Sequence, residues 1–286
     1  SGKLKGVVYV DDKGVQYFQE AGKVIVACNG IGTPRLLLNS KSKAFPEGLA
    51  NSSGLVGKNL MFHPYAAVSG IFDEDDLNYS LGPLANIIIV QEFYETDESR
   101  NFLRGYSFQM NRSHGPAHTA LGAGGAGKII PWGKDHHSEF KKRFKKFLGL
   151  AVISEDLPEL HNRVELDEKL TDRHGIPLPR VFYKTSENTR KLLDHGIGSA
   201  KKLLEEAGCY ETNVVPTLES AGWHLMGTAK MGNDPKTSVV DANCKTHDVD
   251  NLYIIDGSVF TTSAAVNPTP TIQAVALRAA DKILQG

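Results

Sequence analysis

The 286-residue sequence has few cysteines, no excess of charge of either sign and no long apolar run. Its three cysteines, Cys28, Cys209 and Cys244, are scattered and form no CxxC pair, so they predict neither a disulfide framework nor a cysteine-based metal site. With 32 basic and 33 acidic residues the net charge is −1, which argues against a nucleic-acid-binding protein. No apolar stretch reaches the roughly 18 residues that a membrane-spanning helix needs.

What is present is an ordinary globular composition, 41% hydrophobic and 23% charged, with enough length for one large domain or two smaller ones. The first residues pass directly into strand-like sequence and show no signal-peptide pattern. Alternation around a turn at residues 11–14 predicts a β-hairpin within residues 5–26. Residues 23–27 form a short apolar run that is typical of a buried parallel strand.

A strand, a glycine turn and a helix follow one another at this point. The turn lies at residues 28–32, and the helix is predicted to start at Thr33, with Thr33 as its cap and Pro34 in its first turn. This arrangement brings backbone close to a bound cofactor. Near the other end of the chain, residues 251–257 read as a buried strand ending on an acid and a glycine, and residues 271–284 as an amphipathic helix.

The middle of the chain, about residues 65–215, has a different sequence pattern from the two ends. Strand-like stretches at 85–90 and 148–153 are separated by long polar segments. Residues 138–147 predict a helix with a phenylalanine stripe and a solvated basic face, and residues 186–206 predict a longer helix. Cofactor-type α/β sequence at both ends of a mixed middle predicts two interleaved domains.

Four segments resemble the glucose–methanol–choline (GMC) family of flavin oxidoreductases: 24–40, 54–64, 223–232 and 251–271. Residues 54–64, for example, are similar to the family's VGxNLxxHP element. The segments occur in the family's order and span nearly the whole chain, so the sequence resembles the C-terminal part of such an enzyme. In style the motifs look most like the gluconate dehydrogenase, fructose dehydrogenase and pyranose oxidase branch, which favours a sugar or polyol substrate.

The resemblance implies a mixed α/β fold (α+β). The C-terminal part of an FAD-binding domain, residues 1–64 and 216–286, is expected to interleave with an antiparallel-sheet substrate-binding domain, residues 65–215. The N-terminal GxGxxG unit of the family is absent from these residues. Residues 122–127 match the GxGxxG expression but follow no buried strand, so they are expected to form a surface loop.

The resemblance also implies two catalytic residues. Oxidising an alcohol removes a proton and a hydride, and a histidine suits the proton because its ordinary pKa is about 6.5. His224 matches the family's catalytic histidine, and Asn267 matches the position that orients the substrate hydroxyl. The alternatives are a buried histidine bonded to backbone and a turn asparagine before Pro268.

FAD is the cofactor that the resemblance implies. The start of the helix near Pro270 would stabilise negative charge on the flavin. The Asp256-Gly257 pair resembles the element that contacts the cofactor's ribityl–phosphate region, and a plain strand-ending turn is an equal alternative for it. No metal site is expected, since the neighbouring His136 and His137 lack further ligands. The expected cofactor contacts are Ala27, Cys28, Gly30, Thr33, Asp256, Gly257, Asn267, Pro268 and Thr269.

The sequence therefore predicts FAD-dependent oxidation of a CH–OH group, with a small alcohol or sugar as substrate and oxygen, a quinone or a cytochrome as electron acceptor. An N-terminal partner segment would supply the missing phosphate-binding unit. Two alternatives stay open at this point. One is a non-catalytic truncated or split fragment, and the other is hydroxynitrile lyase-like cleavage on the same fold.

Overall fold

The structure is a computed structural model, and its described residues form two compact units. It describes residues 2–73, 88–112, 115–122, 129–218 and 221–285. Unit 1 is built from residues 1–62, 156–184 and 223–286, and unit 2 from residues 63–155 and 185–222. Each unit therefore draws on separate parts of the chain. The middle segment expected at 65–215 is interrupted in the structure by residues 156–184, which belong to unit 1.

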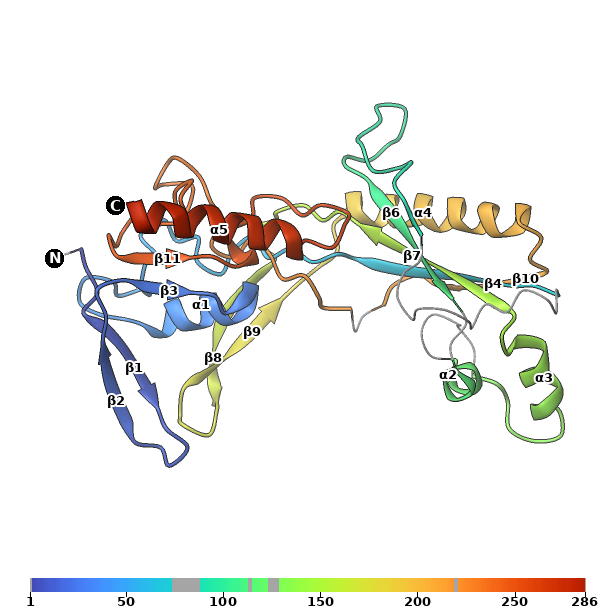
Figure 1. The fold of residues 1–286 in the computed structure, drawn as a ribbon, viewed down its shortest axis with the longest axis horizontal. Helices are drawn as coiled ribbons and strands as arrows, with labels where there is room; N and C mark the ends of the chain where they lie inside the picture. Colours follow the sequence, from blue (N-terminus) through green and yellow to red (C-terminus); the bar gives the residue numbers. More distant parts are fainter. Residues whose placement is uncertain (1, 74–87, 113–114, 123–128, 219–220, 286) are drawn as a thin grey trace. The chain divides into compact units, whose positions relative to one another are not determined.

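Unit 1 contains two hairpins, a parallel pair of strands and the helices that follow that pair (Figure 1). Its strands are β1 (Gly6–Val10), β2 (Gln16–Glu20), β3 (Val24–Val26), β8 (Arg163–Thr171), β9 (Pro177–Phe182) and β11 (Leu252–Ile254). Its helices are α1 (Asn29–Asn39), the short 3-10 helix η1 (Gly257–Val259) and α5 (Thr269–Gln285). The predicted first hairpin is confirmed, because β1 pairs antiparallel with β2. The second hairpin is formed by β8 and β9.

The parallel pair joins two strands from opposite ends of the chain. β3 pairs with β11 in the register Leu252↔Val24 and Ile254↔Val26. Val26, Leu252 and Ile254 are buried in one apolar cluster with Leu37 of α1 and Ala279 of α5. The apolar runs that predicted these strands are therefore the residues that anchor both helices to them.

Unit 2 is built around a five-stranded antiparallel sheet in the order β10-β4-β7-β6-β5. The strands are β4 (Tyr65–Ile71), β5 (Ile89–Val90), β6 (Tyr106–Arg112), β7 (Phe147–Ser154) and β10 (Glu211–Val215). Two short helices, α2 (Pro116–Leu121) and α3 (His136–Arg143), and the long helix α4 (Glu187–Glu206) complete it. The expectation of an antiparallel sheet in the middle of the chain is confirmed.

Helix α4 covers this sheet, packing on β4 and β7 (Figure 1). It starts where predicted, because the Oγ of Ser186 accepts a hydrogen bond from the backbone N–H of Thr189 at 3.0 Å and so satisfies one of the unpaired donors of the first turn. Leu192, Ala200 and Leu204 are buried on its inner face in the cluster that includes Val68 and Val152 of the sheet. The helix thus buries the apolar face that its sequence period predicts.

Three expectations for the middle of the chain need a correction or a limit. The helix expected at 138–147 is wrong in its bounds: α3 ends at Arg143, and Phe147 already belongs to β7. Its phenylalanines therefore do not form one helical stripe. Of the strand expected at 85–90, only Ile89–Val90 is seen as β5, since residues 85–87 lie outside the described residues. Residues 123–128, most of the glycine-rich stretch, also lie outside them.

None of the helices in the described ranges is both long enough and apolar enough to cross a membrane.

Two glycines of α4 make a matched pair for testing this packing. A Cβ added to Gly196 would lie 2.5 Å from Cγ1 of Val152, whereas one added to Gly198 would meet nothing within 4 Å. We expect Gly198→Ala to stabilise the protein by about 0.5–1 kcal/mol through helix propensity. We expect Gly196→Ala to destabilise it by about 1–3 kcal/mol, because β-branched Val152 cannot move aside cheaply. Urea unfolding of both variants measures the difference, and equal stabilisation by the two would contradict this packing.

Candidate functional site

Six of the cofactor contacts expected from the sequence lie at the carboxyl end of the parallel pair: Ala27, Cys28, Gly30, Thr33, Asp256 and Gly257. Beyond β3 the chain runs through Ala27 and Cys28 into α1, and beyond β11 it runs through Asp256 into η1. The pairing extends one step further, since the N–H of Ile255 donates to the carbonyl of Val26 at 3.0 Å. In parallel sheets, ligands bind outside the carboxyl ends of the strands. Ala27 and Cys28 are exposed there, so their atoms are accessible to a ligand.

Asp256 ties the two strand ends together. Its Oδ2 accepts hydrogen bonds from the Oγ1 of Thr33 at 2.6 Å and from the N–H of Asn29 at 3.1 Å. Its Oδ1 accepts from the N–H of Ser258 at 2.8 Å. The carboxylate is buried and faces the first turn of α1, where unpaired N–H groups and the helix dipole favour negative charge. Asp256 is therefore bonded to protein groups on both sides of the strand pair.

Helix α1 starts four residues earlier than predicted, at Asn29 instead of Thr33. The expectation that Thr33 caps it is wrong, because the Oδ1 of Asn29 accepts from the N–H groups of Ile31 and Gly32 at 2.9 and 3.2 Å and so starts the helix earlier. Thr33 lies inside the helix, and its Oγ1 accepts from the N–H of Cys28 at 3.2 Å while donating to Asp256.

Pro34 then lies in the helix interior, where it removes the N–H that would bond the carbonyl of Gly30. The structure satisfies that carbonyl in another way, because the Oγ1 of Thr228 donates to it at 2.8 Å. Both Thr228 and Gly30 are buried, so the carbonyl would otherwise be an unpaired buried group. This bond draws the segment that carries His224 onto α1.

The two glycines of the site are needed for close contact with the backbone of Leu225. A Cβ on Gly30 would lie 2.7 Å from the carbonyl carbon of Leu225, and one on Gly257 would lie 2.8 Å from its carbonyl oxygen. On its other side Gly257 faces Ile272 of α5, whose Cδ1 would be 3.5 Å from the added Cβ. The residue after His224 and the first turn of α5 therefore meet at Gly257.

His224 is half-buried and has a φ of 59°, in the left-handed region that non-glycine residues rarely adopt. Such backbone strain concentrates at functional sites. Burial lowers the pKa of the His224 imidazole, so the ring is neutral at neutral pH and is able to accept a proton. Trp223, the preceding residue, is 47% exposed.

Asn267, Pro268 and Thr269 lead directly into α5. Asn267 and Thr269 are exposed and Pro268 is buried, with its carbonyl accepting the first helical hydrogen bond from Ile272 at 2.9 Å. A cavity of about 280 Å³ lies beside this helix start. Its lining is mainly apolar and consists of Met231, Val259, Phe260, Thr261, Thr262, Ala264, Val266, Pro268, Thr271 and Val275.

Sequence reasoning did not identify Ser258. Its side chain is fully buried, and its Oγ has no hydrogen-bond partner in the described part of the protein. In the sequence, the Asp256-Gly257 pair before it is the feature that points to this position. A buried hydroxyl without a partner carries an unusual free-energy cost.

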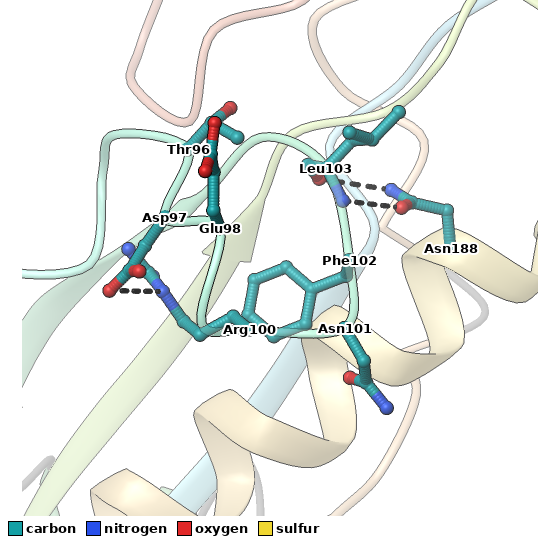
Figure 2. A pocket seen from close by; sticks show the side chains of 8 residues that line it. All are labelled: Thr96, Asp97, Glu98, Arg100, Asn101, Phe102, Leu103 and Asn188. Carbon is teal, nitrogen blue, oxygen red and sulfur yellow. Dashed lines mark hydrogen bonds and ion pairs between the residues drawn. The ribbon is translucent and has the colours of Figure 1, made fainter.

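A second cavity, of about 340 Å³, lies in unit 2 and contains none of the residues expected from the sequence (Figure 2). Its lining consists of Thr96, Asp97, Glu98, Arg100, Asn101, Phe102, Leu103 and Asn188. Within the described ranges, no three His, Cys, Asp or Glu side chains come together as metal ligands would.

Thr33 offers a direct test of the junction between the strand ends. We expect Thr33→Val to destabilise the protein by about 1–3 kcal/mol, because it removes the donor to Asp256 and the acceptor of the Cys28 N–H while keeping the side-chain shape. Thr262→Val, at an exposed position of the same unit, is the control and should change stability by less than about 0.5 kcal/mol. Urea unfolding measures the free energy of unfolding of both variants. Equal changes would contradict the conclusion that the hydrogen bonds of Thr33 stabilise this junction.

Residues 158–276 match the family model for GMC oxidoreductase. Over 285 residues the chain is 42% identical to 2-methyl-1,2-propanediol dehydrogenase of Mycolicibacterium austroafricanum, covering 99% of this chain and 51% of that protein. It is 30% identical to the fructose dehydrogenase large subunit of Gluconobacter japonicus, again covering 99% and 51%. The chain thus spans about half the length of the curated relatives it matches.

The fold agrees with these matches. Pyridoxine 4-oxidase from Mesorbium loti superposes with a TM-score of 0.65 at 13% identity, over 100% of this chain and 56% of that chain. The mixed α/β fold expected from the sequence is therefore confirmed as the fold of part of that structure. The motifs, the family match and the relatives agree, and the chain carries the C-terminal domain of the GMC oxidoreductases.

Proposed function

We propose that this chain provides the alcohol-oxidising part of an FAD-dependent enzyme that acts on a CH–OH group of a polyol or sugar. The relatives named above act, by their names, on a diol and on fructose. The observation that carries the proposal is the meeting at Gly257 of the segment after His224 with the first turn of α5. A proton acceptor and a helix start with unpaired N–H groups are thereby joined in one unit.

The residues present fit FAD in part. The cavity beside α5 has a mainly apolar lining, which suits a flat ring system. The N–H groups at the start of α1 are different, because Asn29 and Asp256 already accept from them. Ala27 and Cys28 would therefore contact the cofactor through their exposed atoms. Gly30, Thr33, Asp256 and Gly257 would fix the backbone at the carboxyl ends of β3 and β11.

When bound, FAD supplies the acceptor for the hydride that leaves the alcohol carbon. The chain's own residues would handle the proton and the orientation. A ring nitrogen of His224 accepts the hydroxyl proton, which its lowered pKa permits at neutral pH. The amide of Asn267 donates to and accepts from the hydroxyl, which orients it. Pro268 and Thr269 present the start of α5, whose dipole stabilises negative charge.

We further propose that a polypeptide segment outside these 286 residues supplies the phosphate-binding unit. The GxGxxG expression occurs here only at residues 122–127, away from any strand–helix unit of the sequence. A separate partner or a linked segment would serve equally. Visible absorption of the chain after desalting with FAD tests this, since retained flavin bands from the chain alone would show that the segment is dispensable.

His224 is the residue to test first in the intact protein with FAD bound. We expect His224→Gln to lower kcat for alcohol oxidation by about 10²–10⁴-fold, because the proton acceptor is lost. In the unchanged protein, kcat/KM should rise with pH through a pKa below about 6.5 and stay level above it, since burial lowers the pKa of this imidazole. Dye reduction with a panel of polyols measures both.

The matched control is His161→Gln, which changes an exposed histidine of the same unit and should leave kcat within about twofold. Unchanged turnover in His224→Gln would refute the assigned role. Absence of dye reduction by every alcohol, together with cleavage of a cyanohydrin, would instead favour the lyase alternative.

Cys28 gives a test that does not depend on turnover. Its thiol is exposed, whereas Cys244 is buried, so a maleimide should label Cys28 first. At a FAD concentration ten times its dissociation constant, labelling of Cys28 should slow by about tenfold, because only the unoccupied fraction reacts. Mass spectrometry of the Cys28 peptide gives the rate, and Cys28→Ser confirms the assignment. An unchanged rate while FAD is bound would remove Cys28 and Ala27 from the cofactor contacts.

A further inference from the structure

Asp156 is a buried acid of unit 1 that the proposed mechanism does not use. It is 1% exposed. Its Oδ2 accepts a hydrogen bond from the hydroxyl of Tyr183 at 2.8 Å and a longer one from the N–H of Phe62 at 3.4 Å. Its Oδ1 accepts from the N–H of Leu157 at 3.1 Å. A buried carboxyl is tolerated where donors satisfy its oxygens, and two of these donors come from distant segments of the same unit.

One of these segments leads to His224. Phe62 follows Met61, which exchanges two backbone hydrogen bonds with Met226. The N–H of Met61 donates to the carbonyl of Met226 at 3.0 Å, and the N–H of Met226 donates to the carbonyl of Met61 at 3.1 Å. Both methionines are fully buried, and His224 lies two residues before Met226. The Asp156 carboxyl is therefore bonded to the residue next to the one that holds the His224 segment.

The backbone of Asp156 holds the loop that carries Asn267. The Oγ of Ser263 accepts from the N–H of Asp156 at 2.7 Å and donates to the carbonyl of Asp156 at 3.1 Å. Ser263 is fully buried and lies four residues before Asn267. The same loop, residues 260–268, supplies much of the lining of the cavity beside α5. One serine oxygen thus ties the middle of this loop to Asp156.

The loop depends on such an anchor. Residues 260–268, all within the described part of the chain, form neither helix nor strand and connect η1 to α5. Thr261 and Thr262 are exposed, whereas Ser263 next to them is buried. A segment without ladder or helical bonds opens easily unless its side chains fix it. Breaking the Ser263 bonds would leave buried polar groups unpaired, which costs free energy, so the anchor favours one position of the loop.

We propose that Asp156 is a positioning residue that fixes His224 relative to Asn267. Its carboxyl holds one segment through Phe62, and its backbone holds the other through Ser263. The proton acceptor and the hydroxyl-orienting amide must fit the same substrate hydroxyl, and a misplacement of about 1 Å costs roughly 10²-fold in rate. Asp156 is buried and acts through these two residues. The inference rests on the proposed alcohol oxidation.

Kinetics of the intact, FAD-loaded protein test this role, with turnover counted per bound flavin. Ser263→Ala removes both bonds to the Asp156 backbone. It should lower kcat for the best polyol of the panel by about 10- to 100-fold and keep KM within about threefold, because alignment is lost while binding is kept. Tyr183→Phe removes a donor to the Asp156 carboxyl and should lower kcat by about 3- to 10-fold. In the double variant the losses should combine to less than their product, because both act through Asp156.

Ser238→Ala is the matched control. Ser238 is a serine of unit 1 that is 2% exposed, and its Oγ donates to the carbonyl of Asp234 at 2.7 Å and is bonded to the Nε2 of His247 at 2.8 Å. Ser238→Ala should lower the free energy of unfolding as Ser263→Ala does but leave kcat within about twofold. Urea unfolding measures the stability of both variants. An equal kcat in the two, or losses that multiply in the double variant, would overturn the proposal.

Hydrogen exchange separates this inference from the proposed function. If the unchanged protein oxidises no alcohol, the proposed oxidation fails, and amide exchange followed by mass spectrometry still decides the role of Asp156. Ser263→Ala should speed exchange about tenfold in residues 261–267 and also in residues 224–227, which are connected to that loop through Asp156. Faster exchange confined to residues 261–267, or equally fast exchange of residues 224–227 in Ser238→Ala, would overturn the connection.

Discussion

The carboxylate of Asp256 holds together the ends of two strands that are more than two hundred residues apart in the chain. A parallel pair of three residues per strand has too few ladder bonds to be stable alone. Asp256 adds bonds to Asn29 and Thr33 of α1 and to Ser258 of η1, so the first turns of both helices depend on one side chain. The carboxylate also complements the dipole of α1. The geometry of the candidate site follows from this junction, because both helices start from it.

The next constraint is close contact between backbones. Gly30 and Gly257 both face the backbone of Leu225, and Gly257 also faces Ile272 of α5. The positive φ of His224 lets the chain turn toward this contact, and the bond from Thr228 to the Gly30 carbonyl keeps it there. The glycines that a sequence pattern assigns to a cofactor are thus already used by the protein's own backbone. The proposed oxidation therefore depends on other groups, the imidazole of His224 and the start of α5.

The sequence predicts most of the helices and strands whose apolar residues follow a local spacing. The hairpin of β1 and β2, the helix α4 and the buried runs of β3, β7 and β11 all follow from alternation, helical spacing or short apolar runs. What the sequence does not predict depends on contacts between distant residues. The early start of α1 needs Asn29 and Asp256, and the end of α3 before Phe147 needs the strand partners of β7. The candidate site residues came from motif resemblance, since no local period marks them.

Glu155 shows how the burial of an acid opposes stability in this fold. Its pKa in the folded protein, about 7, lies above the value of about 4.5 expected in the unfolded chain. Below that lower value the carboxyl is protonated in both states, and its contribution to stability is fully present. As pH rises through about 7 the unfolded chain has already lost the proton that the folded protein retains, so the contribution is lost. A glutamine would avoid this loss, and an arginine at hydrogen-bond distance would reduce it. The structure has neither, since the Nε of Arg104 lies 3.6 Å from the Oε1 of Glu155 and the Arg104 side chain is 45% exposed.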